Sequence, residues 1–117
     1  MTFTILESNF GEYSLNKIYQ GRHWSKRKQD ADYWHHKVLS ELRRQKIPRK
    51  FFLKSVHIDF WFNSRLDSDN HGYIVKLIID GMKGYLIADD NKRHVSSHSI
   101  YFWDGDGVRI EIKEATP

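Results

Sequence analysis

The sequence predicts an α+β domain, a small mixed β-sheet with two helices, in the order strand, helix, strand, helix, strand, strand. Three patterns indicate this. Residues 51–63 alternate apolar and polar side chains, which is typical of a strand with one buried face. Residues 74–82 repeat apolar side chains at the spacing of a helix. Near the end, Asp104 to Gly107 predicts a hairpin turn between strands at 97–103 and 108–113.

The first half of the chain contributes one strand and one long helix. Residues 2–6 indicate a short strand, and residues 8–24 show no clear period, so we expect a loop there. Ser25 suits the N-cap of a helix over residues 26–45, which Pro48 ends. The expected apolar stripe of this helix consists of Ala31, Trp34, Val38 and Leu42.

Length and composition limit the class of protein. The chain has 117 residues, which predicts one domain over residues 1–117. It has no cysteine, so disulfides and thiolate metal sites are excluded and a reducing compartment is favoured. No apolar run is long enough to cross a bilayer and no signal peptide is recognisable, so we expect a cytoplasmic protein without a membrane partner. The net charge of +4 favours a polyanionic partner.

The stretch from Arg65 to Val95 carries the expected functional site. Its two ends are acidic, and carboxylates gathered around one short helix repel one another unless a cation lies among them. Mg²⁺ is the simplest cation to propose because it prefers oxygen ligands. The residues concerned are Asp67, Asp69 and Asn70 before the helix and Asp89 and Asp90 after it.

The helix between these acidic ends has a wide apolar face and one polar stripe. Gly84 is expected to end it, because glycine tolerates a left-handed conformation. Asp80 is expected to form ion pairs with Lys76 and Lys83, which lie one helical turn away on either side. The predicted polar stripe consists of Asp69, Tyr73, Lys76, Asp80 and Lys83.

The motif in this stretch is Asp-x-Asp-Asn, a lysine, Ile-Asp-Gly-Met-Lys-Gly and then Asp-Asp, and it resembles the RusA family of Holliday-junction resolvases. Residues 14–19 and Ser25 resemble the N-terminal region of that family more loosely. Two features depart from the family pattern. Lys76 follows Asn70 by six residues instead of three, and Tyr13 stands where a proline normally precedes the serine.

The resemblance implies a Mg²⁺-dependent endodeoxyribonuclease, with Mn²⁺ as a substitute, that resolves four-way DNA junctions in recombination and repair. Asp67, Asp69 and Asp90 would be catalytic metal ligands, with Asp89 as an alternative to Asp90. Lys76 would supply a positive charge to the transition state. The resemblance also implies a homodimer, a bacterial or prophage origin and no nucleotide cofactor. We expect the dimer interface to use the apolar surface of residues 74–82 or the strands beside it.

A basic region with exposed aromatic residues is the expected DNA-binding surface. Residues 17–50 contain eleven Lys or Arg against three Asp or Glu, an excess that favours contact with phosphates. Two alternatives stay open: a metal nuclease of the same fold acting on flaps or forks, and a non-catalytic junction-binding protein with a structural acidic cluster. The candidate DNA-binding residues are Lys17, Arg22, Trp24, Lys26, Arg27 and Lys28.

Overall fold

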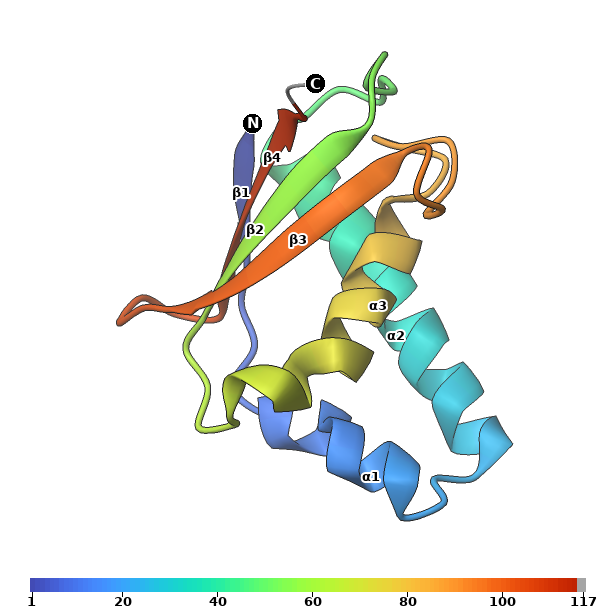
Figure 1. Cartoon of the computed structure of the whole chain (residues 1–117), viewed down its shortest axis with the longest axis vertical. Coiled ribbons are helices and arrows are strands. Elements are labelled where there is room, and N and C mark those ends of the chain that lie inside the picture. The colour runs from blue at the N-terminus through green and yellow to red at the C-terminus, as the bar shows by residue number, and fades with distance from the viewer. Residues whose placement is uncertain (116–117) are drawn as a thin grey trace.

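The structure is a computed structural model that describes residues 1–115. A mixed four-stranded sheet packs on one face against the helices, which confirms the predicted α+β class (Figure 1). The strands are β1 (Thr2–Ile5), β2 (Val56–Phe62), β3 (Val95–Phe102) and β4 (Val108–Glu114), in the spatial order β1-β4-β2-β3. The helices are α1 (Leu15–Tyr19), α2 (Trp24–Arg44) and α3 (Gly72–Met82), with 3₁₀ turns η1 (Phe10–Tyr13) and η2 (Ser68–His71).

The connection between β3 and β4 is not a hairpin, so that prediction was wrong. β3 pairs in parallel with β2, and β4 pairs antiparallel with β2 on its other side. The β2–α3–β3 crossover places β3 on one side of the central strand. Turn residues in Asp104 to Gly107 indicate a reversal of the chain, but they do not indicate which strand comes next in the sheet.

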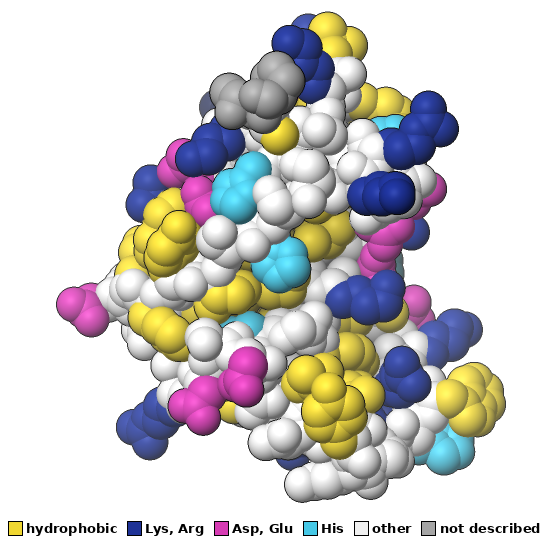
Figure 2. Space-filling view, in the orientation of Figure 1, with side chains coloured by type: hydrophobic (Ala, Val, Ile, Leu, Met, Phe, Trp, Pro, Cys, Tyr) yellow, Lys and Arg dark blue, Asp and Glu magenta, His cyan; other side chains and the backbone are white. Residues whose placement is uncertain are grey.

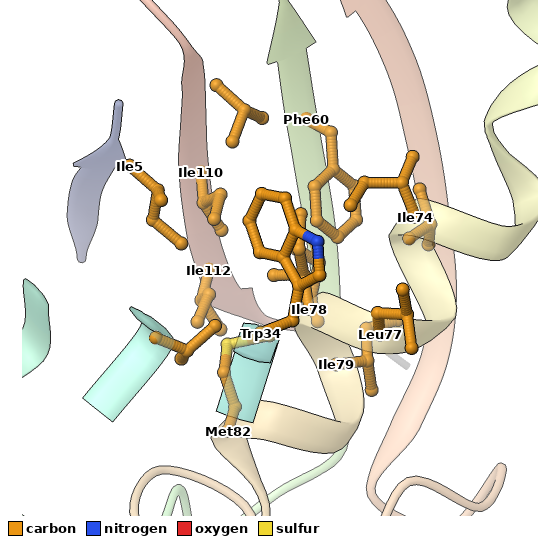
Figure 3. Close-up of a cluster of buried hydrophobic side chains, with 14 of the residues drawn as sticks. Ile5, Trp34, Phe60, Ile74, Leu77, Ile78, Ile79, Met82, Ile110 and Ile112 are labelled. Carbon is orange, nitrogen blue, oxygen red and sulfur yellow. The ribbon is translucent and has the colours of Figure 1, made fainter. Parts of the chain in front are cut away.

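The core lies between the sheet and the two long helices. Trp34 of α2 is completely buried, and Figure 3 shows its indole ring between Phe60 and Ile110 of the sheet and Ile78 of α3. The two helices are in close contact at Gly81, where an added Cβ would lie 2.9 Å from Val38. The apolar side chains of α3 are therefore buried within a single chain.

Several local predictions need correction. Residues 8–24 contain η1 and α1, with Ser14 capping α1 by accepting a hydrogen bond from the Lys17 amide at 3.3 Å. The long helix begins at Trp24, with His23 as its N-cap, rather than after Ser25. The second strand begins only at Val56, although the apolar-polar alternation was assigned from residue 51.

Two side chains lie on faces that the helical patterns did not predict. Ala31 is exposed on α2, whereas Asp30 is buried beside Trp34. Tyr73 was placed on the polar stripe of α3, but it is buried and donates a hydrogen bond to Asp30 at 2.8 Å. Gly84 was predicted as the C-cap of α3, but the C-cap is Lys83 in an extended conformation, and Gly84 follows it with φ +80°.

Candidate functional site

Asp67 and Asp69 lie at η2, the turn that leads from β2 into α3. Both side chains are exposed, and within residues 1–115 neither makes a side-chain hydrogen bond or ion pair. The buried His71 positions this turn, because its Nδ1 donates to the Asp67 carbonyl at 2.8 Å and its Nε2 lies 3.2 Å from Ser64 Oγ. Burial lowers the pKa of His71, which favours the neutral ring that this pairing needs.

Asn70 ties the acidic turn to the N-terminal region. Its Oδ1 accepts a hydrogen bond from the backbone amide of Asn16 in the first turn of α1, at 3.0 Å. Amides in the first turn of a helix have no partner within the helix, so a side-chain oxygen at this place stabilises α1. The bond fixes α1 beside the two exposed carboxylates.

A cleft of about 190 Å³ lies between α3 and β3. Its lining residues include Lys76, Asp90 and His98 together with the apolar Val75 and Ile79. Figure 2 shows this side of the molecule, with histidine side chains across the middle and basic and acidic side chains next to one another along the right-hand margin. His98 is not among the site residues predicted from the sequence, because only the register of β3 places it beside α3.

Lysine side chains accompany the acidic residues around α3. Lys76 Nζ lies 3.3 Å from Asp80 Oδ2, and Lys83 Nζ lies 4.0 Å from Asp80 Oδ1, which confirms the predicted ion pairs. Lys83 also lies 3.9 Å from Asp89 and 3.7 Å from Asp90. The ammonium group of Lys83 therefore neutralises part of the negative charge of Asp89 and Asp90.

The structure does not bring all the predicted metal ligands together. In the described part of the chain, no three Asp, Glu or His side chains lie close enough to hold one metal ion. Asp67 and Asp69 precede α3, whereas Asp90 follows it, and this helix of eleven residues is about 16.5 Å long at roughly 1.5 Å per residue. Asp67 and Asp69 thus lie before the first turn of α3, and Asp90 lies near its other end, beside Lys83.

The predicted DNA-binding residues fall into an exposed group and an internal one. Trp24 is 70% exposed at the start of α2, close in sequence to Tyr19, which is 77% exposed at the end of α1. Lys17 is half-exposed and lies 3.7 Å from Glu12. The basic side chains exposed on the first turns of α2 are Lys26, Arg27 and Lys28.

Arg22 is the internal member of this set. Its guanidinium donates two hydrogen bonds to the buried Asp30 carboxylate, at 2.7 and 3.1 Å, and only 10% of its side chain is exposed. These bonds raise the pKa of Arg22 above its usual value. Arg22 therefore connects the α1–α2 turn to the core and is not part of the exposed basic surface.

A polar network lies on the sheet face away from the helices, where the sequence predicted no site. His57 Nδ1 lies 2.6 Å from Ser97 Oγ, and His57 Nε2 lies 2.7 Å from the buried carboxylate of Asp59. Lys113 approaches the same carboxylate at 3.6 Å. Alternation along β2 places His57 and Asp59 on one face, but Ser97 joins them only through the register with β3.

The chain was compared with models of protein families, with curated proteins and with solved structures, and none of the three comparisons found a match. Within residues 1–115, no helix combines the length and apolar character needed to span a membrane. The fold and the site define an α+β domain with a cleft beside one edge of its sheet, lined by Lys76, Asp90 and His98 among apolar residues.

Proposed function

We propose that this protein is a Mg²⁺-dependent endonuclease that cuts branched DNA, with four-way junctions as its substrate. The observation that carries the proposal lies at the start of α3: two exposed carboxylates at η2, which have no side-chain partner among residues 1–115, lie next to a helix whose cleft is lined by Lys76 and Asp90. The resemblance to RusA resolvases supports it through the same residues. We place its action in a bacterial or prophage setting in the cytoplasm.

The donor chemistry of η2 fits Mg²⁺. This ion often binds through one or two carboxylates, with water and substrate phosphate completing its coordination, so Asp67 and Asp69 would suffice as the first ligands. Asp90 would hold the ion from the cleft or bind a second one, after exchanging its contact with Lys83. When bound, the metal would lower the pKa of a water molecule and neutralise charge on the scissile phosphate.

Side chains of the chain itself would orient the DNA. Lys76 is 66% exposed and paired with Asp80 in a single contact at 3.3 Å, so its ammonium is available to a phosphate oxygen. His71 would keep the Asp67 backbone in place while the carboxylates bind. The exposed rings of Tyr19 and Trp24 would stack on unpaired bases at the branch point.

A non-catalytic junction-binding protein is the second candidate, and a specific contact favours it. Lys83 lies within 4.0 Å of Asp80, Asp89 and Asp90, so the second acidic group is compensated without a metal. In that case the basic surface would bind the junction and the acidic residues would only stabilise the loop after α3. A nuclease for flaps or forks would use the same site on a different substrate.

A cleavage assay separates these functions. Labelled four-way junction, flap and duplex of equal length are incubated with the protein, with and without Mg²⁺. We expect Mg²⁺-dependent paired nicks in the junction, and we expect Asp69→Asn to abolish them while junction affinity in a gel shift stays equal or increases. Asp32→Asn is the matched control, because Asp32 is an exposed aspartate on α2.

Each outcome selects one function. Preferred cutting of the flap would indicate the flap nuclease, and tight junction binding without any cut would indicate the binding protein. Lys76→Met is expected to lose most cleavage and keep binding, and Lys76→Arg to recover only part of it. Wild-type nicking by Asp69→Asn would show that η2 is not part of the active site. Wild-type nicking by Lys76→Met would direct attention to Lys83 or Lys92.

A further inference from the structure

A cavity of about 320 Å³, here called the apolar pocket, lies between the loop that leads into β2 and the turn after α3. The loop precedes β2, whereas η2 follows that strand, so the apolar pocket and the acidic turn lie at opposite ends of β2 (Figure 1). Its volume is in the range of cavities that bind ligands. Most of the lining is apolar and comes from Ile47, Pro48, Phe51, Phe52, Leu53 and Leu86.

Hydrogen bonds hold the wall of the apolar pocket in place. The Phe52 amide donates to the Leu86 carbonyl at 3.0 Å, and the Tyr85 hydroxyl donates to the Ile47 carbonyl at 2.5 Å. These bonds join the loop before β2 to the turn after α3. A pocket that is formed before its partner arrives loses less conformational entropy on binding, so binding there is favoured.

Large apolar side chains at the mouth of the pocket are in contact with water. Leu53 is 92% exposed and Phe51 is 42% exposed, although both line the cavity. Burial of such side chains against a partner is favourable, because it removes apolar surface from water. An exposed apolar patch with a polar rim is typical of a site that binds another molecule.

The charges around the apolar pocket favour an acidic partner. Lys50 and Glu114 are both among its lining residues, and both are exposed. Residues 46–54 contain no acidic residue, so positive charge is in excess at the rim. Carboxylates of a partner would be attracted to this excess and oriented by it. The basic side chains of this loop, all of them exposed, are Lys46, Arg49, Lys50 and Lys54.

We propose that the apolar pocket binds a short peptide segment of another protein that combines acidic residues with large apolar ones. An apolar side chain of the peptide would enter the cavity beside Leu53 and Leu86, and its carboxylates would pair with Lys50 and Lys54 at the rim. A concave pocket suits a single protruding side chain, which a bilayer surface does not offer. The proposal does not rest on nuclease activity.

Fluorescence anisotropy with a labelled, C-terminally amidated peptide of sequence Glu-Asp-Glu-Leu-Phe tests the proposal on the whole chain. We expect saturable binding that weakens as the salt concentration rises, because exposed charges are screened. Two control peptides separate the contributions. Gln-Asn-Gln-Leu-Phe lacks the carboxylates and Glu-Asp-Glu-Ala-Ala lacks the large apolar side chains, and each should bind at least about tenfold more weakly.

Variants of the protein locate the bound peptide. Leu53→Asp should weaken the affinity for Glu-Asp-Glu-Leu-Phe at least about tenfold, because it places a carboxylate at the mouth of the pocket. Leu6→Asp is its matched control, since Leu6 is also exposed but follows β1. Lys50→Glu should weaken the affinity about threefold or more, whereas Lys28→Glu, on the first turns of α2, should leave it unchanged. Circular dichroism checks that each variant is folded.

The proposal is overturned if Glu-Asp-Glu-Leu-Phe shows no saturable binding up to about 1 mM, or if either control peptide or Leu53→Asp binds equally well. Sedimentation with phosphatidylglycerol vesicles that Leu53→Asp abolishes would instead assign the surface to a membrane. Displacement of the peptide by single-stranded oligothymidine would assign it to a nucleic acid. Dissociation of an oligomer by Leu53→Asp in light scattering would assign it to a second copy. Failure of the nuclease proposal would leave peptide binding unchanged.

Discussion

The carboxylate of Asp30 shows how single residues connect distant parts of this chain. It is only 3% exposed, and it receives two hydrogen bonds from Arg22 and one from Tyr73. Burial and then the contact with Asp30 raise the pKa of Tyr73 to about 12, so its hydroxyl remains a donor. Helical periodicity could not predict this site, because it sorts residues by polarity and an acidic residue is expected outside.

Removing Arg22 should destabilise the fold strongly. Arg22→Met leaves a buried carboxylate without its cation, so we expect the free energy of unfolding to fall by about 3–5 kcal/mol. Urea denaturation measures it, and Lys28→Met, an exposed neighbour on α2, should change it by less than about 0.5 kcal/mol.

A second substitution checks the cause. In the Arg22→Met background, Asp30→Leu should recover most of the lost stability, because it removes the unpaired charge. A stable Arg22→Met protein with weakened junction binding would instead support the role in DNA contact that the sequence suggests.

At the level of elements, α3 is the part that sequence patterns describe best. Its apolar repeat, its ion pairs and its end near Gly84 follow from residue spacing alone. Its surroundings do not follow from spacing. The acidic residues at its two ends were expected to hold one or two Mg²⁺ ions, and in the structure they precede and follow a helix of eleven residues. The turn after β3 was expected to form a hairpin, but β2 lies between the two strands.

The contact between α2 and α3 gives a prediction at this scale. A valine at position 81 would overlap Val38, since even its Cβ would lie 2.9 Å from that side chain. We expect Gly81→Val to lower the free energy of unfolding by about 1–3 kcal/mol, measured by urea denaturation. Gly11→Val is the control, because no atom lies within 4 Å of the added Cβ there. Equal stability of the two variants would show that the helices separate at little cost.

For the whole molecule, the basic end of α2 determines how DNA would be held. Lys26 and Lys28 are exposed at the start of this helix of 21 residues, whereas Lys50 and Lys54 are exposed beyond its far end. The excess of basic residues was visible in the sequence. The sequence did not show that Arg22 is internal while the other basic residues are exposed, because this depends on how α1 and α2 meet.

Junction binding should therefore depend steeply on salt, because phosphate neutralisation releases counterions. We expect Lys26→Ala/Lys28→Ala to reduce the slope of log affinity against log salt by about 2, since each phosphate contact contributes roughly 1. The same change at Lys50 and Lys54 should leave the slope unchanged. Gel-shift titrations at several salt concentrations measure it, and equal slopes for both variants would place the DNA elsewhere.

The free margin of β3 also affects how the protein behaves in concentrated solution. An unprotected strand edge accepts any other extended segment, including one from a partly unfolded neighbour, and can start aggregation. We therefore expect Ser96→Lys, which adds a charge to this edge strand, to stay clear on storage at concentrations where the wild-type protein precipitates, even when both proteins unfold at the same temperature.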